Sequence, residues 1–222
     1  MIDLFAYLQN NSYPGRGIIA GDHNGEVFLA YFIMGRSENS RNRIFVKEDG
    51  ILKTRAFDES KVKDPSLIIY NAVRSYNDHR IVTNGDQTDT IYSCFKRGKS
   101  FRQGLDGREY EPDVPNYTPR ISAYLNDREV HLSIIRRENE ECRRLYYDYL
   151  QKENVAYFIS TYDHDGDPLP SFSRDPIRVK ITKPFEQFAS DLWNCLDQNN
   201  KISLYCLEGK KDIIYNRNEE TR

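Results

Sequence analysis

Residues 18–34 read IIAGDHNGEVFLAYFIM and consist of two apolar runs separated by the tetrapeptide DHNG. Both runs are rich in β-branched and aromatic residues, which favour an extended backbone. Asn24-Gly25 supplies the two positive-φ residues of a type I′ turn, which connects antiparallel strands tightly. The segment therefore predicts a β-hairpin formed by residues 18–21 and 26–34.

Other short apolar runs bounded by turn residues recur along the chain. They predict strands over residues 43–47, 51–57, 66–73, 80–83, 120–125, 130–136, 156–162, 177–181 and 202–207. Asn126-Asp127 lies between two of these runs and predicts a second hairpin turn.

Few segments have the apolar spacing of a helix. Residues 88–98 and 183–197 do, the first ending at Gly98 and the second carrying Pro184 near its first turn. A third helix is expected over residues 138–150, a segment crowded with charge and tyrosine.

The remaining segments have no clear period. Residues 98–116 are rich in Gly, Pro and Asp and predict a long ordered loop, and residues 209–222 predict a frayed polar tail. No repeat, low-complexity linker or break in composition divides the chain, so residues 1–222 are predicted to form one domain.

Strands dominate this pattern, helices are few and the hairpins are local. The sequence therefore predicts an α+β fold of antiparallel or mixed sheets with helices packed on the outer faces. A doubly wound parallel fold needs a helix after almost every strand, which this sequence lacks.

Composition and charge exclude several classes of partner. Of the 222 residues, 32 are Lys or Arg and 34 are Asp or Glu, so the net charge of −2 gives no bulk attraction to nucleic acid. No stretch approaches the roughly 20 apolar residues of a membrane span, and the N-terminus lacks the basic region of a secretion signal. We expect a cytoplasmic protein with no nucleic-acid or membrane partner.

The residues that commonly hold metals or act as nucleophiles form no known pattern. The four cysteines and four histidines are scattered, without C-x-x-C or H-E-x-x-H spacing. There is no G-x-S-x-G motif, P-loop or Gly-rich dinucleotide fingerprint. The sequence therefore predicts neither a metal site nor a nucleotide cofactor.

An arginine-rich segment, residues 35–43 (GRSENSRNR), directly follows the second strand of the hairpin. Arg36 and Arg41 can bind a phosphate in bidentate fashion, and Ser37 and Asn42 can complete such a cradle. A solvated polar loop is the alternative, but the preference for arginine over lysine favours an anion site.

Two other arginines and one acid lie next to predicted strands. Arg16 follows a Pro-Gly turn and precedes the first strand, and Arg120 begins the strand at 120–125. Both are further candidates for the anion. Glu111 lies in the Pro-rich loop before Arg120, where the alternative to a functional role is a solvated carboxylate.

Polar residues also end two apolar runs in the middle of the chain. Tyr70-Asn71 ends one run, and Asn84-Gly85 ends the next and leads into the helix expected over 88–98. Strand ends beside a helix N-terminus suit ligand recognition. Strand-end packing, turn chemistry and helix capping are the alternatives for these residues.

Several short motifs occur along the chain in a fixed order. They are YPGR (13–16), RSENSRNR (36–43), YN (70–71), TNG (83–85) with TD (88–89), TPRI (118–121) and GDPLPSF (166–172). Their order resembles archaeal-type inosine monophosphate (IMP) cyclohydrolase and its bacterial relatives over roughly residues 13–181. Residues 1–12 have no counterpart and are expected to form an N-terminal extension.

This resemblance implies both a fold and a reaction. The fold is a four-layered αββα sandwich with mainly antiparallel sheets, similar to N-terminal-nucleophile hydrolases but without their nucleophile. The reaction closes 5-formamidoimidazole-4-carboxamide ribonucleotide to IMP with loss of water, in purine biosynthesis and without a cofactor. We also expect the enzyme to be a homo-oligomer that binds a purine nucleotide.

The resemblance also implies roles for individual residues. Tyr70, Glu111 and Asn84 are expected to be catalytic, with Asn84 and Asn71 holding the base. The residues expected to bind the substrate are Arg16, Arg36, Ser37, Arg41, Asn42, Asn71 and Arg120. The alternatives are a non-catalytic module that binds or senses purine nucleotides and a hydrolase of a related amide or cyclic amidine.

Overall fold

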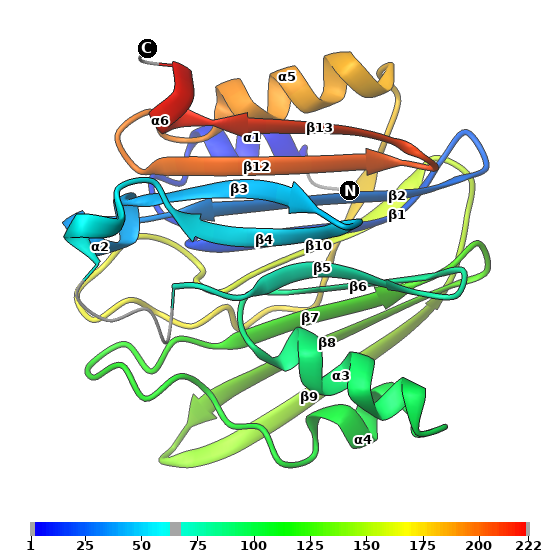
Figure 1. The fold of residues 1–222 in the computed structure, drawn as a ribbon, viewed down its shortest axis with the longest axis horizontal. Coiled ribbons are helices and arrows are strands. Elements are labelled where there is room, and N and C mark those ends of the chain that lie inside the picture. The colour runs from blue at the N-terminus through cyan, green and yellow to red at the C-terminus, as the bar shows by residue number, and fades with distance from the viewer. Residues whose placement is uncertain (1–2, 63–67, 221–222) are drawn as a thin grey trace.

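The computed structural model describes residues 3–62 and 68–220, which form two antiparallel sheets and a few short helices (Figure 1). The six-stranded sheet has the order β11 (Ile177–Lys180), β10 (Val155–Ser160), β1 (Arg16–His23), β2 (Glu26–Met34), β12 (Lys201–Glu208) and β13 (Lys211–Asn216). The seven-stranded sheet follows chain order: β3 (Arg43–Glu48), β4 (Ile51–Ala56), β5 (Asn71–Tyr76), β6 (His79–Thr83), β7 (Arg120–Leu125), β8 (Glu129–Glu138) and β9 (Glu141–Leu150). The predicted α+β class with mainly antiparallel sheets is confirmed.

The hairpin predicted from residues 18–34 is present as β1 and β2. Asn24 has φ 55° and Gly25 has φ 79°, as a type I′ turn requires. The hairpin predicted at Asn126-Asp127 also forms, because β7 pairs antiparallel with β8 across it.

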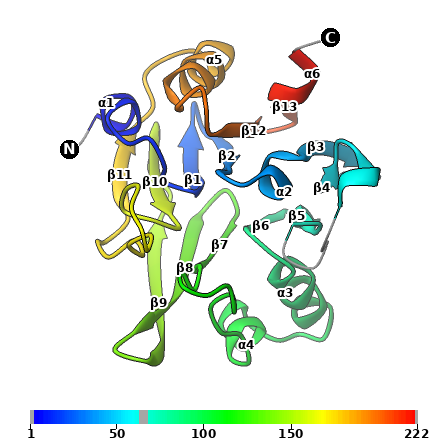
Figure 2. The same cartoon turned by 90° about the vertical axis from the view of Figure 1, so that its left-hand side faces the viewer.

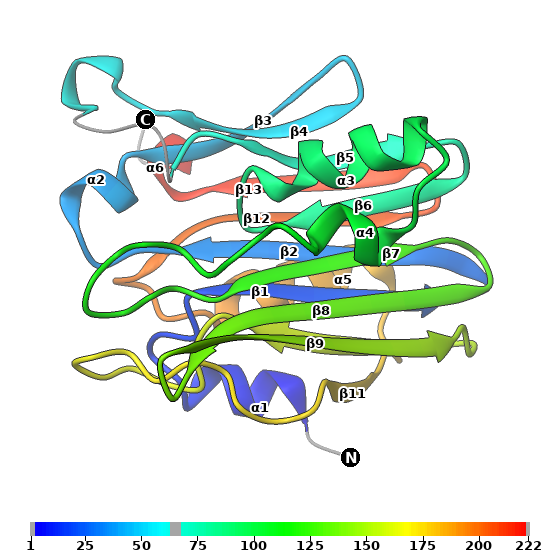
Figure 3. The same cartoon turned by 90° about the horizontal axis from the view of Figure 1, so that it is seen from below.

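Helices cover the outer face of each sheet. In Figure 2, α1 (Leu4–Gln9) and α5 (Phe185–Cys195) lie beyond the six-stranded sheet, and α3 (Gln87–Lys96) and α4 (Phe101–Leu105) lie beyond the seven-stranded sheet. Figure 3 shows α3 and α4 across the strands β5 to β8. The shorter helices are α2 (Glu38–Arg41), the 3-10 helix η1 (Glu59–Lys61) and α6 (Arg217–Glu220). None of the described helices has the length and apolar character that a membrane crossing requires.

Strand β2 shows why one stretch of sequence determines so much of the fold. Its residues 28–34 are all buried, because both faces of the strand are covered. Tyr31 faces the other sheet and stacks on Phe45 of β3 at 5.5 Å between ring centroids, whereas Phe28 packs against Phe188 of α5 at 5.1 Å. A strand covered on both faces needs a continuous apolar run rather than an alternating one.

The helix expected over residues 138–150 was wrong, since this segment forms the edge strand β9. Three residues at alternate positions of this strand, Leu145, Tyr147 and Tyr149, pack against the hydrophobic core. Tyr149 stacks on Tyr157 of β10 with 3.7 Å between ring centroids. Contact with the other sheet therefore favours a strand in a segment that was expected to be a helix.

Other differences concern the ends and loops of the chain. The loop predicted over 98–116 contains the helix α4, and the tail predicted over 209–222 contains β13 and α6. Strand β13 is ordered by antiparallel pairing with β12. The strand predicted at 66–73 begins at Asn71 instead, and residues 66 and 67 of that prediction lie outside the described residues.

The N-terminal residues 3–12 also pack on the body of the protein. Asp3 caps α1 by accepting from the amides of Phe5 and Ala6. Leu4 and Leu8 are buried at 2 % and 1 % exposure, and the ring of Phe5 contacts that of Phe188 at 5.2 Å. The extension is therefore part of the hydrophobic core.

Replacing Leu8 tests this integration. We expect Leu8→Ala to lower the free energy of unfolding by about 2–5 kcal/mol, because it leaves a cavity under α1. Gln9→Ala on the exposed side of the same helix is the matched control and should have little effect. Urea denaturation measures both, and equal stability of Leu8→Ala and the unsubstituted protein would contradict this packing.

Candidate functional site

One pocket lies where the start of β1, the end of β2 and the start of β3 meet the loops that precede β7 and follow β10. Its volume is about 240 Å³. It is lined by Tyr13, Arg16, Met34, Arg36, Ser37, Ser40, Arg43, Asp113, Asn116, Thr118, Tyr162 and Leu169. Both sheets thus contribute side chains to one polar pocket.

Arg16 is held at the pocket by a close contact between the chain before β1 and the end of β10. Gly15 has a φ of +78°, and a Cβ there would lie 2.2 Å from Oγ1 of Thr161, so the approach requires glycine. The amide of Arg16 donates to the Thr161 hydroxyl over 3.1 Å. The Nε of Arg16 is buried and has no hydrogen-bond partner among the described residues.

Arg43 is a pocket residue that the sequence analysis did not select. It is fully buried, and its Nε and Nη2 donate to the carbonyl oxygens of Ser40 and Met34 at 2.7 and 3.3 Å. Its Nη1 is also buried without a partner in the described part of the chain. Because an unsatisfied buried donor costs free energy, a ligand oxygen that accepts from it would be stabilised.

Two tyrosines meet beside these arginines. The hydroxyls of Tyr31 and Tyr70 are 2.7 Å apart and buried. Thr54 fixes the backbone of Tyr70, since its amide donates to the Tyr70 carbonyl over 2.9 Å and its hydroxyl accepts from the Tyr70 amide over 2.8 Å. Burial raises the pKa of Tyr70, against the lowering influence of Arg43 and Arg16. Tyr70 is therefore a phenol that stays protonated at neutral pH.

Glu111 completes the charged cluster. Its side chain is 2 % exposed, and Oε2 lies 3.9 Å from Nη2 of Arg16. The amide of Glu111 donates to the Thr118 carbonyl over 2.9 Å and fixes the loop that carries it. Burial raises the pKa of Glu111 to about 7, although the positive charges of Arg16 and Arg120 act to lower it. A carboxyl that titrates near neutrality can exchange a proton with a substrate.

An aromatic wall closes one side of the pocket. Tyr13 and Tyr162 stack with 6.0 Å between ring centroids, and the Tyr162 hydroxyl lies 2.5 Å from Oγ1 of Thr118. Burial raises the pKa of Tyr162 to about 12. Tyr162 was not among the residues expected at the site. Its hydrogen-bond partner Thr118, however, is the first residue of the TPRI motif (118–121).

Three of the residues expected from the sequence, Arg16, Arg36 and Ser37, line this pocket. Glu111 and Tyr70 are buried and do not line it, but Glu111 pairs with Arg16, and the charges of both act on the ionisation of Tyr70. Arg36 and Ser37 line its more exposed side. Ser37 also caps α2, accepting from the Ser40 amide.

Two residues of the arginine-rich segment lie elsewhere. Arg41 lines a separate hollow, and its Nε and Nη2 donate to the Gly35 carbonyl and the Asn200 side chain at 3.0 and 3.3 Å. Nδ2 of Asn42 donates to the Asp58 carbonyl at 2.7 Å, and Oδ1 of Asn42 accepts from the Asp58 amide at 2.8 Å. Asn42 therefore connects the start of β3 to the end of β4 rather than facing the pocket.

The side-chain amide of Asn84 is used within the protein. It accepts from the Ile121 amide at 2.8 Å and from Gln87 Nε2 at 3.1 Å, and it donates to the Pro119 carbonyl at 2.9 Å. These bonds join the end of β6 to the start of β7.

Arg120 and Asn71 also have protein partners. Nη1 of Arg120 donates to Asp86 at 2.9 Å and to Gln87 at 2.8 Å, and Asn71 Nδ2 donates to Asp89 at 2.9 Å. The positive charge of Arg120 acts to lower the pKa of Glu111, whereas Asn71 binds a residue of α3.

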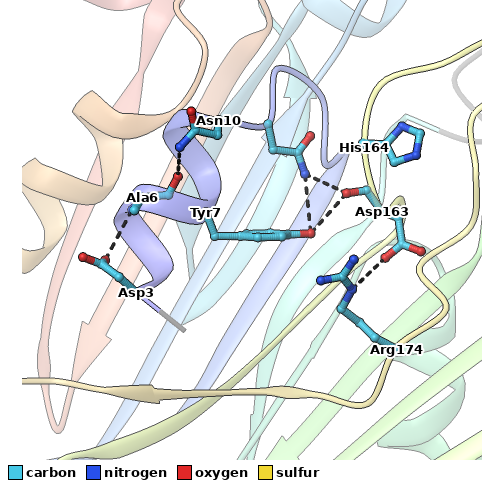
Figure 4. A pocket seen from close by; sticks show the side chains of 8 residues that line it. Asp3, Ala6, Tyr7, Asn10, Asp163, His164 and Arg174 are labelled. Atoms are coloured by element: carbon cyan, nitrogen blue, oxygen red, sulfur yellow. Dashed lines mark hydrogen bonds and ion pairs between the residues drawn. The ribbon is translucent and has the colours of Figure 1, made fainter. Parts of the chain in front are cut away.

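A more open hollow lies between the N-terminal helix and the loop that follows β10 (Figure 4). Its lining includes Tyr7, Asn10, Asp163, His164 and Arg174, and Figure 4 shows the hydroxyl of Tyr7 directed at the backbone of Asp163. It contains no counterpart to the buried cluster of arginine, glutamate and tyrosine. Across residues 3–62 and 68–220, no three His, Cys, Asp or Glu side chains are placed to hold a metal ion.

Comparison with known proteins identifies the relatives of this chain. The sequence profile of the family described as IMP cyclohydrolase-like protein matches residues 13–212. The chain is 30 % identical to the IMP cyclohydrolase of Thermococcus kodakarensis over 159 aligned residues. The alignment covers 69 % of this chain and 75 % of that protein. The chain is 28 % identical, with the same coverage, to the IMP cyclohydrolase of Methanosphaera stadtmanae. It is also 28 % identical to that of Methanocella arvoryzae, over 68 % of this chain and 74 % of that protein.

The raised pKa of Glu111 makes folding depend on pH. The folded protein holds a proton up to about pH 7 that the unfolded chain releases near the ordinary pKa of 4.5. Stability relative to Glu111→Gln should therefore fall as pH rises through this window, by on the order of 3 kcal/mol. Urea denaturation of both proteins at the two ends of the window measures it, and a constant difference would show that Glu111 titrates normally.

Proposed function

The chain belongs to the IMP cyclohydrolase-like family, and we propose that it closes 5-formamidoimidazole-4-carboxamide ribonucleotide to IMP with loss of water. The observation that carries the proposal is the buried meeting of Glu111 and Tyr70 with Arg16 and Arg43. A module that only binds nucleotides needs an anion cradle, but it does not need a buried carboxyl that titrates near neutrality.

The reaction requires two proton removals and one leaving water. The carboxamide nitrogen attacks the formyl carbon and loses one proton, the formamide nitrogen loses another, and the formyl oxygen leaves with both as water. Ionised Glu111 accepts the proton of the attacking nitrogen. Tyr70, whose pKa is raised by burial, donates to the formyl oxygen while negative charge develops there.

Buried arginines stabilise that charge. The carboxamide nitrogen is a poor nucleophile, so the rate depends on positioning it against the formyl carbon and on donors aimed at the developing oxyanion. Nε of Arg16 and Nη1 of Arg43 are buried donors without a partner among the described residues. They are suited to this role because they are already fixed by the backbone contacts of β1 and β3.

One end of the pocket is buried and the other is open to solvent, and this difference suits one orientation of the nucleotide. We propose that the reacting groups lie at the buried end and that the 5′-phosphate lies near Arg36 and Ser37, at the exposed side. Phosphate is strongly hydrated and favours the side open to water, and a guanidinium can bind it in bidentate fashion.

We propose further that the sheets and helices form the four-layered αββα sandwich that the resemblance implies. Helices lie outside both sheets, and residues of both sheets share one hydrophobic cluster, which supports this arrangement. The single domain, the homo-oligomer and the cytoplasmic location remain predictions from the sequence.

The formation of IMP from the formylated ribonucleotide, followed by ultraviolet absorbance, tests the proposed function. Tyr70→Phe and Glu111→Gln should each lower kcat by about 10²–10⁴-fold while largely retaining IMP affinity, because each removes a proton role and little volume. For the unsubstituted protein, kcat/KM should rise with pH through about 7 as Glu111 ionises.

The controls are Tyr92→Phe on α3 and Glu153→Gln in the exposed turn before β10, which make the same chemical changes outside the pocket. Both should keep normal turnover. Near-normal kcat in Tyr70→Phe and Glu111→Gln would contradict the mechanism, and no turnover by the unsubstituted protein would favour a nucleotide-binding module.

A further inference from the structure

Arg36 at the mouth of the pocket is bound to a carboxylate of the protein itself. Its Nη1 donates to Oδ1 of Asp165 at 2.8 Å and to the Gly166 carbonyl at 3.0 Å. Its guanidinium also lies over the ring of Tyr13, 5.0 Å from the centroid. The Arg36 side chain is 39 % exposed, against 11 % for Arg16, so Arg36 is a pocket arginine that an incoming anion can reach from solvent.

Asp165 is itself held in place from two sides. The Ser12 hydroxyl donates to Oδ2 of Asp165 at 3.3 Å, and the Gly166 amide donates to Oδ1 at 3.0 Å. The carboxylate therefore faces Arg36 in a defined orientation instead of pointing freely into solvent.

The N-terminal extension anchors the loop that carries Asp165. Asn11 Nδ2 donates to the Asp163 carbonyl at 2.8 Å. The Tyr7 hydroxyl donates to the same carbonyl at 3.1 Å (Figure 4). Arg174 binds the side chain of Asp163 at 3.2 Å. Since the family profile begins at residue 13, Tyr7 and Asn11 lie outside the region shared with the family.

The same loop continues across the pocket. Leu169 lines the pocket, and its amide donates to Oδ1 of Asn116 on the opposite wall at 3.1 Å. The pocket volume of about 240 Å³ lies below the roughly 300–1,000 Å³ typical of small-molecule sites. The loop and the Arg36–Asp165 pair thus narrow the space that a nucleotide would need.

We propose that the Asp165 carboxylate competes with the nucleotide phosphate for the guanidinium of Arg36. To bind Arg36, the phosphate must displace this carboxylate. This inference rests on the proposed function. Carboxylate and phosphate oxygens accept from the same guanidinium N–H groups. The pair is about two-fifths exposed on both sides, and such exposed ion pairs are weak, so a doubly charged phosphate can displace the carboxylate. The N-terminal extension contributes by holding the competing carboxylate and its loop in place.

Calorimetric titration of the full chain with IMP and with inosine tests the proposal. In Asp165→Asn, which keeps the shape of the side chain but removes its charge, IMP should bind about five-fold more tightly at low salt. The gain should shrink as salt screens the pair. Inosine, which lacks the phosphate, should bind equally to both proteins. Asp167→Asn, an exposed acid of the same loop, should behave like the unsubstituted protein.

A double-mutant cycle identifies Arg36 as the group exchanged. In Arg36→Ala, adding Asp165→Asn should give no further gain in IMP affinity. An unchanged or weaker affinity of Asp165→Asn for IMP, an equal gain for inosine, or the same gain without Arg36 would each overturn the proposal. If the unsubstituted protein binds no IMP, the proposed function fails with it, whereas an unchanged affinity beside normal IMP binding overturns this inference alone.

Discussion

The side chains of Arg16 and Arg43 are buried at a pocket to which both sheets contribute, with the Glu111 carboxylate 3.9 Å from Arg16. A buried charge is stable only when neighbouring groups compensate it. Here the protein leaves Nε of Arg16 and Nη1 of Arg43 without partners among the described residues. Burial raises the pKa of Glu111 to about 7 and keeps Tyr70 protonated, although the charges of the neighbouring arginines act to lower both pKa values. The site is therefore built for a ligand that supplies oxygen acceptors.

Both sheets contribute residues to that cluster, and the hydrophobic core that they share holds them together. Strand β2 is apolar on both faces, so it can lie between the outer helices and the second sheet and still present Tyr31 to Tyr70. The tight contact of Gly15 with Thr161 then delivers Arg16 to the same place. The polar side chains of the cluster are thus buried away from water, where their hydrogen bonds are stronger than in solvent.

The sequence was informative where structure depends on neighbouring residues and uninformative where it depends on distant ones. The Asn24-Gly25 hairpin and helix α5 were predictable because turn geometry and helical spacing are local signals. The arginine-rich segment indicated an anion site, but the burial of Arg43 depends on the packing of β3, an edge strand, against β12 and β13 of the other sheet. Asn84 resembled a ligand-binding residue, yet its amide is taken up by the chain around β7, which sequence spacing cannot reveal.

The most direct test of the central claim is the pKa of the Glu111 carboxyl in the free protein. The side-chain carboxyl carbons of glutamate can be labelled with ¹³C and followed by NMR during a pH titration, with Glu111→Gln identifying the signal. The buried cluster predicts a midpoint of about 7 for Glu111. A midpoint near the ordinary value of 4.5 would mean that Glu111 is solvated or fully neutralised by arginine, and would contradict its role as the base.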